Sequence, residues 1–247
     1  MIRTLLIIPC YNEGKNISKV IQAIENYILL NSSLLETHGI IIDYIVINDC
    51  SKDNTLDVLM CNRYNYLKLP VNLGIGGGVQ TGYIYAKENG YDIAIQHDGD
   101  GQHDPKYFVD LISIIEFEAA DIVVGSRFID KKGFQSTWLR RFGIIFLSKL
   151  IYLCSGVKVY DVTSGYRAVN RKYIEFFATC YAQDYPEPES LIEAALNNAK
   201  IVETPVVMHE RKEGKSSINA LGSLYYMVKV SLAILLHRLT VSKKSGV

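Results

Sequence analysis

Short apolar runs rich in β-branched residues alternate with segments of helical periodicity through the first half of the chain, and this alternation constrains the fold more than any other feature. Strands are predicted at residues 4–8, 40–47, 66–69, 91–96 and 121–124, and helices at residues 17–30, 53–61, 76–87 and 105–117, with Asn16 as the first N-cap. Such alternation produces a mainly parallel sheet. The sequence therefore predicts an α/β fold with helices flanking that sheet.

The composition fits one large domain and argues against several kinds of partner. The 247 residues are 49% hydrophobic, which is ample for a buried core. Lys and Arg number 26 and Asp and Glu number 26, so no nucleic-acid partner is expected. The five cysteines are scattered without a Cys-x-x-Cys spacing, which argues against a zinc site or a disulfide framework and favours a reducing cytosol.

Polar motifs follow the predicted strands directly, at residues 11–13 (Tyr-Asn-Glu), 48–49 (Asn-Asp) and 98–100 (Asp-Gly-Asp). Ligands of parallel sheets bind beyond the carboxyl ends of the strands. In the last motif a divalent cation would offset the repulsion between Asp98 and Asp100, and Gln102 can add an amide oxygen. An ordinary acidic surface turn contains the same residue types, so this motif alone leaves both interpretations open. His97 and His103 are expected beside the turn rather than as ligands.

Further motifs occur in a fixed order around this turn. They are Pro-Cys-Tyr-Asn-Glu at 9–13, Asn-Asp-Cys-Ser at 48–51, the glycine cluster at 72–78, Gly-Ser-Arg-Phe at 125–128, Asp-Val-Thr-Ser-Gly-Tyr-Arg at 161–167, Glu189, Glu-Thr-Pro at 203–205 and Arg-Lys-Glu-Gly-Lys-Ser at 211–216. This set resembles the inverting GT-A glycosyltransferases of family 2, especially the polyprenyl-phosphate (dolichyl-phosphate-like) sugar transferases. The resemblance implies a GT-A (Rossmann-like) domain at residues 1–218.

The implied reaction is inverting transfer of a hexose from a nucleotide-diphosphate sugar to a polyprenyl phosphate, with Mg²⁺ or Mn²⁺ as cofactor. The alternatives are transfer to a saccharide hydroxyl in cell-surface polysaccharide synthesis and a nucleotide-binding regulatory subunit without turnover. The intact acidic triplet argues against the regulatory subunit. A UDP-sugar is the default donor and GDP-mannose stays open, because Asn48 stands where the family has Asp and leaves the base preference unassigned.

The resemblance also implies roles for individual residues. The nucleotide sugar is assigned to Pro9, Tyr11, Glu13, Asp49, Gly76, Asp98 and Lys215, the metal to Asp98, Asp100 and Gln102, and catalysis to Asp100, Glu189 and Arg211. Arg211 and Lys215 belong to a basic loop that closes over the diphosphate. Glu189 acts either as a base or by orienting acceptor and sugar, and a helix-start carboxylate is the alternative.

The acceptor phosphate is assigned to Arg127, Arg141 and Arg167, because Arg pairs with phosphate in a bidentate geometry. A solvated helix start at Arg140 and Arg141 is the alternative. The family often carries another Arg within a turn of this pair, and that Arg is missing here.

Two apolar stretches, residues 142–159 and 221–241, are interrupted by charges and do not span a membrane comfortably. The second stretch forms a wide apolar helical stripe closed by Arg238, Lys243 and Lys244. Residues 219–247 are therefore predicted to form an amphipathic helix with a basic tail that lies on a membrane surface. A homo-oligomer interface is the alternative. The protein is expected to be cytoplasmic and peripheral on the inner face of the membrane, with a small membrane partner as a further option.

Overall fold

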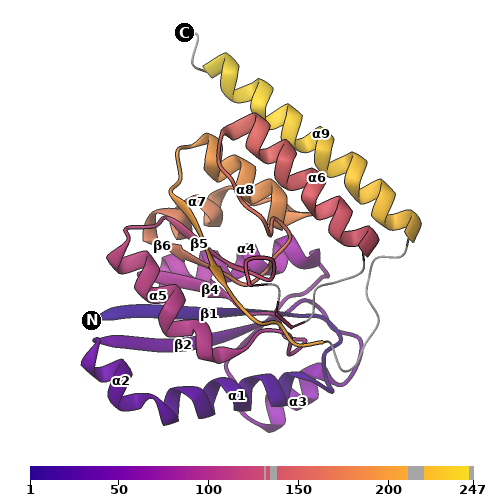
Figure 1. Ribbon diagram of the computed structural model, residues 1–247. Coiled ribbons are helices and arrows are strands. Elements are labelled where there is room, and N and C mark those ends of the chain that lie inside the picture. The colour runs from indigo at the N-terminus through magenta and orange to yellow at the C-terminus, as the bar shows by residue number, and fades with distance from the viewer. Residues whose placement is uncertain (131, 134–137, 211–219, 245–247) are drawn as a thin grey trace.

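The structure, a computed structural model, describes residues 1–130, 132–133, 138–210 and 220–244 (Figure 1). The strands are β1 (Ile2–Cys10), β2 (Ile40–Asn48), β3 (Tyr66–Lys68), β4 (Ile93–Gln96), β5 (Ile122–Ser126), β6 (Arg167–Asn170) and β7 (Ile201–Pro205). The helices are α1 (Ile17–Leu30), α2 (Ser32–Thr37), α3 (Thr55–Cys61), α4 (Gly74–Glu88), η1 (Pro105–Tyr107), α5 (Phe108–Phe117), α6 (Trp138–Ser155), α7 (Arg171–Thr179), α8 (Pro186–Leu196) and α9 (Ala220–Lys244). Every strand and helix predicted from the sequence is present, with small shifts at the ends.

The strands form one mostly parallel sheet in the order β3-β2-β1-β4-β6-β5-β7. β1 is parallel to β2 and β4, β2 to β3, and β5 to β7. β6 is the exception, because it runs antiparallel to both β4 and β5. The predicted α/β fold with a mainly parallel sheet is confirmed, and β6 and β7 are strands that the sequence analysis did not predict.

The direction of β6 matters for the edge of the sheet where polar groups gather. Arg167, the first residue of β6, is paired with Gln96, the last residue of β4. Parallel strands bring the loops that follow them to this edge, whereas β6 brings the loop that precedes it. The segment at 161–166 therefore reaches the same edge as the acidic turn after β4.

The sheet separates two apolar layers. Successive residues of β1 point to opposite faces, so Leu5 and Ile7 join one buried cluster while Leu6 and Ile8 join the other. Helices α1, α3 and α5 contribute to the second cluster. Helices α4, α7 and α8 contribute to the first, and α6 and α9 pack beyond α8 at the outside of the molecule (Figure 1).

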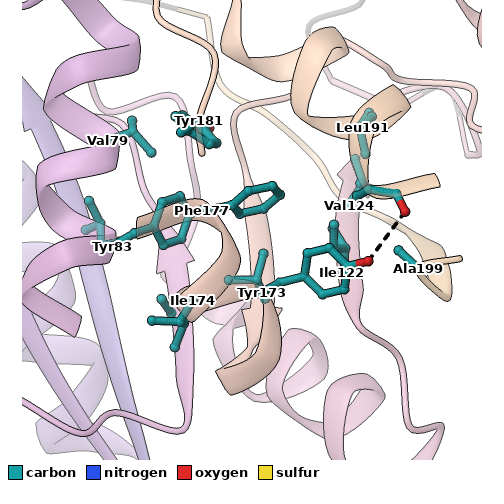
Figure 2. Packing of buried hydrophobic residues seen from close by; sticks show 14 of the residues in the cluster. Val79, Tyr83, Ile122, Val124, Tyr173, Ile174, Phe177, Tyr181, Leu191 and Ala199 are labelled. Carbon is teal, nitrogen blue, oxygen red and sulfur yellow. Dashed lines mark hydrogen bonds between the residues drawn. The ribbon is translucent and has the colours of Figure 1, made fainter. Parts of the chain in front are cut away.

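Aromatic contacts hold the first layer together (Figure 2). The ring centroids of Tyr83 in α4 and Phe177 in α7 lie 5.4 Å apart, and those of Phe177 and Tyr181 lie 5.1 Å apart. Tyr173 of α7 donates its hydroxyl hydrogen to the carbonyl oxygen of Ala194 in α8 (3.4 Å). These contacts join α7 to α4 on one side and to the last turn of α8 on the other.

Asn16 occupies the predicted N-cap position, but it does not make the side-chain bond expected there. α1 begins at Ile17 as expected, but Asn16 has φ −106° and ψ −38° and its side chain does not cap the helix. Instead, Nδ2 of Asn16 donates to Oε2 of Glu13 at 2.7 Å. The amide therefore fixes a predicted site residue rather than the helix end.

The predicted C-terminal helix is present as α9. The predicted boundary between residues 218 and 219 lies outside the described residues, so the division into two units stays a prediction. No helix in the described part of the chain is long and apolar enough to cross a membrane.

Candidate active site

Hydrogen bonds join the loops that follow β1 and β2. The backbone N–H of Asn12 donates to Oγ of Ser51 (3.0 Å), and Oδ1 of Asn12 accepts from the backbone N–H of Lys52 (2.7 Å). Asn12 and Cys50 both adopt the left-handed region, with φ of 58° and 55°. Non-glycine residues adopt this region rarely, so both turns depend on their surroundings. The two loops together form a fixed frame at the edge of the sheet.

Three predicted nucleotide residues come from the first strand and its loop. Glu13 is 7% exposed, and its backbone N–H donates to Oγ1 of Thr55 (3.0 Å). Tyr11 is exposed to solvent. Pro9 lies within β1, and a Cβ at Gly99 would be 3.2 Å from the carbonyl oxygen of Pro9. The first loop therefore adjoins the acidic turn after β4.

Asp49 ties the loop after β2 to the start of α4. It is 4% exposed, and its two carboxylate oxygens accept from the backbone N–H groups of Leu73 (2.7 Å) and Gly74 (2.9 Å). These bonds satisfy donors at the start of a helix that lack partners within it. The predicted role of Asp49 beside the nucleotide base stays a prediction.

Gly76 is needed where α4 meets a neighbouring segment. A Cβ at this position would lie 2.3 Å from the carbonyl oxygens of both Ala182 and Gln183. Only glycine therefore allows this close approach of two backbones. Its assignment to the nucleotide sugar stays a prediction.

The acidic turn after β4 carries Asp98 and Asp100, both partly exposed. Oδ1 of Asp98 accepts from Nε2 of Gln96 (3.1 Å), and Oδ1 of Asp100 accepts from the backbone N–H of Gln102 (3.0 Å). A Cβ at Gly165 would lie 3.0 and 3.3 Å from the two oxygens of Asp98. The loop before β6 thus approaches this carboxylate closely, and glycine leaves space beside it.

The residues of this turn fit a hard divalent cation by their chemistry. Mg²⁺ commonly binds one or two carboxylates together with substrate phosphates. Within the described ranges, no group of three or more His, Cys, Asp and Glu side chains is placed to hold a metal ion. Gln102 and the phosphates of a donor would therefore have to complete the ligand set. Nε2 of Gln102 donates to the carbonyl oxygen of His209 (3.1 Å), so the side-chain oxygen is the atom suited to a cation.

Buried rings support the backbone of the acidic turn. Nδ1 of His103 accepts from the backbone N–H of Asp98 (3.0 Å), and the ring stacks on Tyr166 with centroids 4.5 Å apart and planes 9° apart. Tyr166 donates its hydroxyl hydrogen to the carbonyl oxygen of Asp104 (2.9 Å). Burial lowers the pKa of His103 to about 4, so the ring is neutral near pH 7 and can accept this bond. His103 therefore stabilises the backbone conformation of the acidic turn.

The turn is also bonded to the chain that leads towards the predicted basic loop. The backbone N–H of His209 donates to the carbonyl oxygen of Gln102 (2.9 Å), and the Gln102 side chain returns a bond to His209. Arg211 and Lys215, predicted to close over the diphosphate, lie outside the described residues. Their roles stay predictions.

Arg127 projects from the loop after β5 and is held by a buried carboxylate. Its Nε and Nη2 donate to the two oxygens of Asp161 (2.7 Å each), and Nη2 also donates to Oγ1 of Thr163 (3.0 Å). Burial lowers the pKa of Arg127, but Asp161, followed by Asp98 and Glu187, raises it above its ordinary value. Asp98 of the acidic turn and Glu187 of α8 are therefore among the carboxylates that raise the pKa of Arg127.

The other two predicted phosphate arginines are placed differently. Arg141 in α6 lies 5.6 Å from the ring centroid of Phe128, and Arg127 lies 5.3 Å from the same ring, so the structure brings these two arginines together. Arg167 is 3% exposed and donates to the carbonyl oxygens of Val162, Ser164 and Glu187 and to Oγ of Ser190. These bonds connect the loop before β6 to α8 through Arg167. The contact of Arg167 with a phosphate stays a prediction.

Two glutamates in the first turn of α8 have different neighbours. Burial raises the pKa of Glu189, and the charges acting on it belong to His237, Asp184, Lys229 and Glu193. Burial also raises the pKa of Glu187, but the charges acting on it belong to Arg167, Asp98 and Arg140. Glu187 is therefore the glutamate of α8 whose surroundings include the acidic turn, and sequence reasoning missed it. The Pro-Glu-Pro-Glu pattern contains no signal for which carboxylate turns inward, and catalysis by Glu189 stays a prediction.

The edge of this mostly parallel sheet gathers a carboxylate-rich turn, buried carboxylates and arginines, which is compatible with a glycosyltransferase. The chain belongs to Glycosyl transferase family 2, whose model matches residues 5–177. It is 32% identical over 221 residues to UDP-N-acetylglucosamine--dolichyl-phosphate N-acetylglucosaminyltransferase of Methanococcus voltae, covering 81% of this chain and 83% of that protein. It is 27% identical over 242 residues to polyprenol monophosphomannose synthase of Mycolicibacterium smegmatis, covering 93% and 86% respectively. The predicted family is confirmed.

Solved structures share the fold. Mannosyl-3-phosphoglycerate synthase from Rubrobacter xylanophilus matches with a TM-score of 0.67 and 14% identity, covering 100% of this chain and 75% of that one. Glucosyl-3-phosphoglycerate synthase from Mycobacterium tuberculosis, solved with Mn²⁺, uridine diphosphate and glucosyl-3-phosphoglycerate, matches with a TM-score of 0.63 and 18% identity, covering 96% and 79%. At such identities the likeness concerns the fold alone, and the predicted GT-A fold is confirmed.

Proposed function

We propose that the protein transfers a hexose from a nucleotide-diphosphate sugar to a polyprenyl phosphate, with inversion at the anomeric carbon. The observation that carries this proposal is that the acidic turn at Asp98 and the arginines Arg127 and Arg141 lie at the same edge of the sheet. Carboxylates suit a metal-bound diphosphate, and arginines suit a second phosphate. The names of two relatives include dolichyl phosphate and polyprenol, which supports a lipid phosphate as acceptor.

The donor would lie between the first two loops and the acidic turn. Glu13 and Asp49 are buried in the frame of those loops and would flank the base. Asp98, Asp100 and Gln102 would hold Mg²⁺ or Mn²⁺, which offsets negative charge on the departing nucleotide diphosphate when bound. The solved neighbour that contains Mn²⁺ and uridine diphosphate supports a UDP-sugar, with GDP-mannose as the alternative.

A lipid phosphate needs no general base, because it is already ionised at neutral pH. One of its oxygens would attack the anomeric carbon from the face opposite the diphosphate, so that a new C–O bond forms as the bond to the diphosphate breaks. Arg127 and Arg141 would hold this phosphate and reduce its repulsion with the donor. Because Asp161 fixes Arg127, that guanidinium is oriented before the acceptor binds.

One observation favours a saccharide hydroxyl as the alternative acceptor. A hydroxyl must lose its proton as it attacks, and burial raises the pKa of Glu187, which makes this carboxylate a better proton acceptor. The negative charge of Asp98 also raises the pKa of Glu187. The charged residues that affect the pKa of Glu189 instead include His237 and Lys229 of α9. Under this alternative Glu187 would take the proton.

The test is incubation of the full chain with UDP-sugars and GDP-sugars, Mn²⁺ and a polyprenyl phosphate. The proposal expects a glycolipid and release of the nucleotide diphosphate. Products formed only on a saccharide acceptor would replace the lipid acceptor, and absence of diphosphate release with every donor would favour a nucleotide-binding regulatory protein. Arg141→Ala is expected to raise the KM for lipid phosphate about tenfold without changing the KM for the donor. Lys19→Ala, at an exposed position of α1 away from the site, is the control and should leave both KM values unchanged.

A further inference from the structure

The Glu-Thr-Pro motif occupies the last three residues of β7, the outermost strand on its side of the sheet. The side chain of its first residue, Glu203, bonds to the loop that precedes β6. Oε2 of Glu203 accepts from the backbone N–H of Tyr160 (2.7 Å), and Oε1 accepts from the backbone N–H of Asp161 (2.9 Å). Because both carboxylate oxygens are engaged, Glu203 fixes the backbone of two successive residues of the loop.

Asp161, one of those two residues, holds Arg127 by its backbone and by its side chain. Asp161 is 0% exposed, and its Oδ2 accepts from the backbone N–H (3.0 Å) and from Nε (2.7 Å) of Arg127. Its Oδ1 accepts from Nη2 of Arg127 (2.7 Å), which also donates to Oγ1 of Thr163 (3.0 Å). A planar guanidinium that is bonded through two of its nitrogens has a fixed plane. The position of Asp161 therefore determines the direction of Arg127.

The paired strands close these contacts into a ring. β5 and β7 are parallel, and Ser126, the last residue of β5, is paired with Pro205, the last residue of β7. Arg127 directly follows Ser126 in the chain. The ring runs from β7 through Glu203 to Asp161, from Asp161 to Arg127, and back to β7 through β5. A shift of the loop at Asp161 must therefore also shift Arg127 relative to β5.

The same loop reaches the acidic turn. Ser164 donates its hydroxyl hydrogen to the carbonyl oxygen of Gly125 (2.6 Å), which joins the loop to β5 a second time. A Cβ at the next residue, Gly165, would lie 3.0 Å from an oxygen of Asp98. The loop that Glu203 fixes at one end thus approaches the proposed cation site at the other end, and it sets the separation between that site and the arginine.

We propose that Glu203 is a positioning residue, which sets the guanidinium of Arg127 in the direction that the acceptor phosphate requires. Glu203 acts through the backbone of the loop and through Asp161. Glutamine at position 203 has nearly the same shape but only one oxygen, so its NH₂ group would face one of the two backbone N–H groups. The loop would then move, and Asp161 would no longer hold Arg127 in the same plane. The contact with a phosphate rests on the proposed function, whereas the positioning of Arg127 does not.

A carboxylate with similar bonds lies at the beginning of the same two strands and supplies a matched control. Asp121 directly precedes β5, and its Oδ2 accepts from the backbone N–H of Lys200 (2.9 Å), which directly precedes β7. Its Oδ1 accepts from Nδ2 of Asn170 (2.9 Å). Like Glu203, Asp121 is partly exposed. Asp121→Asn should therefore lower the melting temperature about as much as Glu203→Gln, without an effect on Arg127.

The experiment follows the Nε–H group of Arg127 by NMR in the isotope-labelled full chain, without donor or metal. The signal is assigned by its absence in Arg127→Lys. Because Nε donates to Asp161, we expect slow exchange of its hydrogen with water in the unmodified chain. Glu203→Gln is expected to speed this exchange about tenfold, as for the loss of one hydrogen bond, whereas Asp121→Asn should leave it unchanged. Glu203→Asp, which retains the charge but is shorter, should give an intermediate rate, and it replaces Glu203→Gln if that variant does not fold.

Binding of a short-chain polyprenyl phosphate, measured by titration calorimetry without donor, is the second readout. Glu203→Gln should weaken this binding about tenfold, and Asp121→Asn should bind like the unmodified chain. Unchanged exchange in the Glu203 variants, or equal acceleration in Asp121→Asn, would overturn the positioning role. Faster exchange in Glu203→Gln, together with unchanged or absent phosphate binding, would retain that role and overturn the assignment of the acceptor phosphate to Arg127, which belongs to the proposed function.

Discussion

The carboxylates after β2 and after β4 lie at the same edge of the sheet but in different surroundings. Asp49 is buried, and each of its oxygens receives a backbone N–H from the start of α4. Asp98 and Asp100 are partly exposed on a turn whose backbone, rather than its carboxylates, is fixed by His103. The difference indicates that one region uses its negative charge to hold the fold, whereas the other leaves its charge partly exposed, where we propose that a cation binds. Substitutions in the two regions should therefore affect different measurements.

The largest effect is expected at Asp161, the extreme case of a carboxylate that holds the fold. Asp161→Ala would leave Arg127 as a buried charge without its partner, and the free energy of unfolding should fall by about 3–5 kcal/mol. Urea denaturation measures this loss. Thr163→Val, which removes only one neutral acceptor of Arg127, is the control and should cost about 1 kcal/mol. A loss at Asp161 no larger than that of the control would contradict the prediction.

Asp100 tests the other region. Asp100→Asn removes a charge proposed to hold the cation, and turnover with saturating donor and Mn²⁺ should fall about 10²–10³-fold. The melting temperature should stay close to that of Asp110→Asn, an exposed carboxylate of α5 whose substitution should leave turnover unchanged. Unchanged activity would remove Asp100 from the site, and a large drop in melting temperature would erase the contrast with Asp49.

Asp49→Ala should show the reverse pattern. Loss of the bonds to Leu73 and Gly74 should cost about 1–2 kcal/mol of stability, measured by urea denaturation. Turnover at saturating donor should change only a few-fold. The substitution is expected to weaken the start of α4 and the affinity for the donor, and a saturating donor concentration compensates for the lower affinity. Abolished turnover with unchanged stability would show that the two regions do not differ as described.

The two glutamates of α8 form an internally matched pair. Glu187→Gln should lower kcat with a saccharide acceptor about tenfold, because this carboxylate would take the proton, and should change kcat with a lipid phosphate little. Glu189→Gln should lower kcat less than Glu187→Gln does with the saccharide acceptor, because the charged neighbours of Glu189 include His237 and Lys229 of α9. Steady-state kinetics with both acceptor classes measures the two effects, and the opposite ranking would support the predicted catalytic role of Glu189.

The smallest effect concerns pH and Asp53, which belongs to the frame of the first two loops. Partial burial alone would raise its pKa, but hydrogen bonds from Thr55 and Gly14 outweigh it and hold the pKa below the usual 3.8. A lowered folded-state pKa contributes stability above that usual value, and the contribution disappears as pH falls through the folded pKa. Since the carboxylate is largely exposed, Asp53→Asn should cost less than about 1 kcal/mol at pH 7. Urea denaturation of both forms between neutral and acidic pH should show that their difference in free energy of unfolding shrinks as pH falls. A difference that stays constant would contradict the prediction.

Hydrophobic periodicity and the turn residues between elements predicted much of the fold, because both signals are local in the sequence. The helix at 17–30 has the predicted ends, and the three polar motifs lie where strands end. β6 escaped prediction because its sequence, Arg-Ala-Val-Asn, contains no apolar run and its partners lie more than 40 residues away in the chain. The sequence resemblance included the segment at 161–167, but the antiparallel pairing that brings it to the edge is a long-range property.

Side-chain direction was the harder part of the site. A helical stripe at 221–239 is readable from spacing, but only packing determines that Val230 and Ile234 enter the core while the stripe faces outward. The same limit applies to Glu187 and Glu189, two positions apart on α8. Asn16 was predicted to cap the helix from its residue type and its position before the apolar run. Its side-chain amide donates to the carboxylate of Glu13 instead. In each case a partner distant in space or unsuspected in sequence determined the outcome.

The reciprocal bonds between Gln102 and His209 have a thermodynamic consequence. The turn that would bind the cation and the chain that leads to Arg211 are joined, so a shift in either one strains or favours the other. A ligand that stabilises one position of Gln102 must therefore bias His209, and by reciprocity whatever draws His209 changes affinity at the turn by the same factor. Under the proposed function, a donor diphosphate bound at the turn would therefore also favour one position of His209.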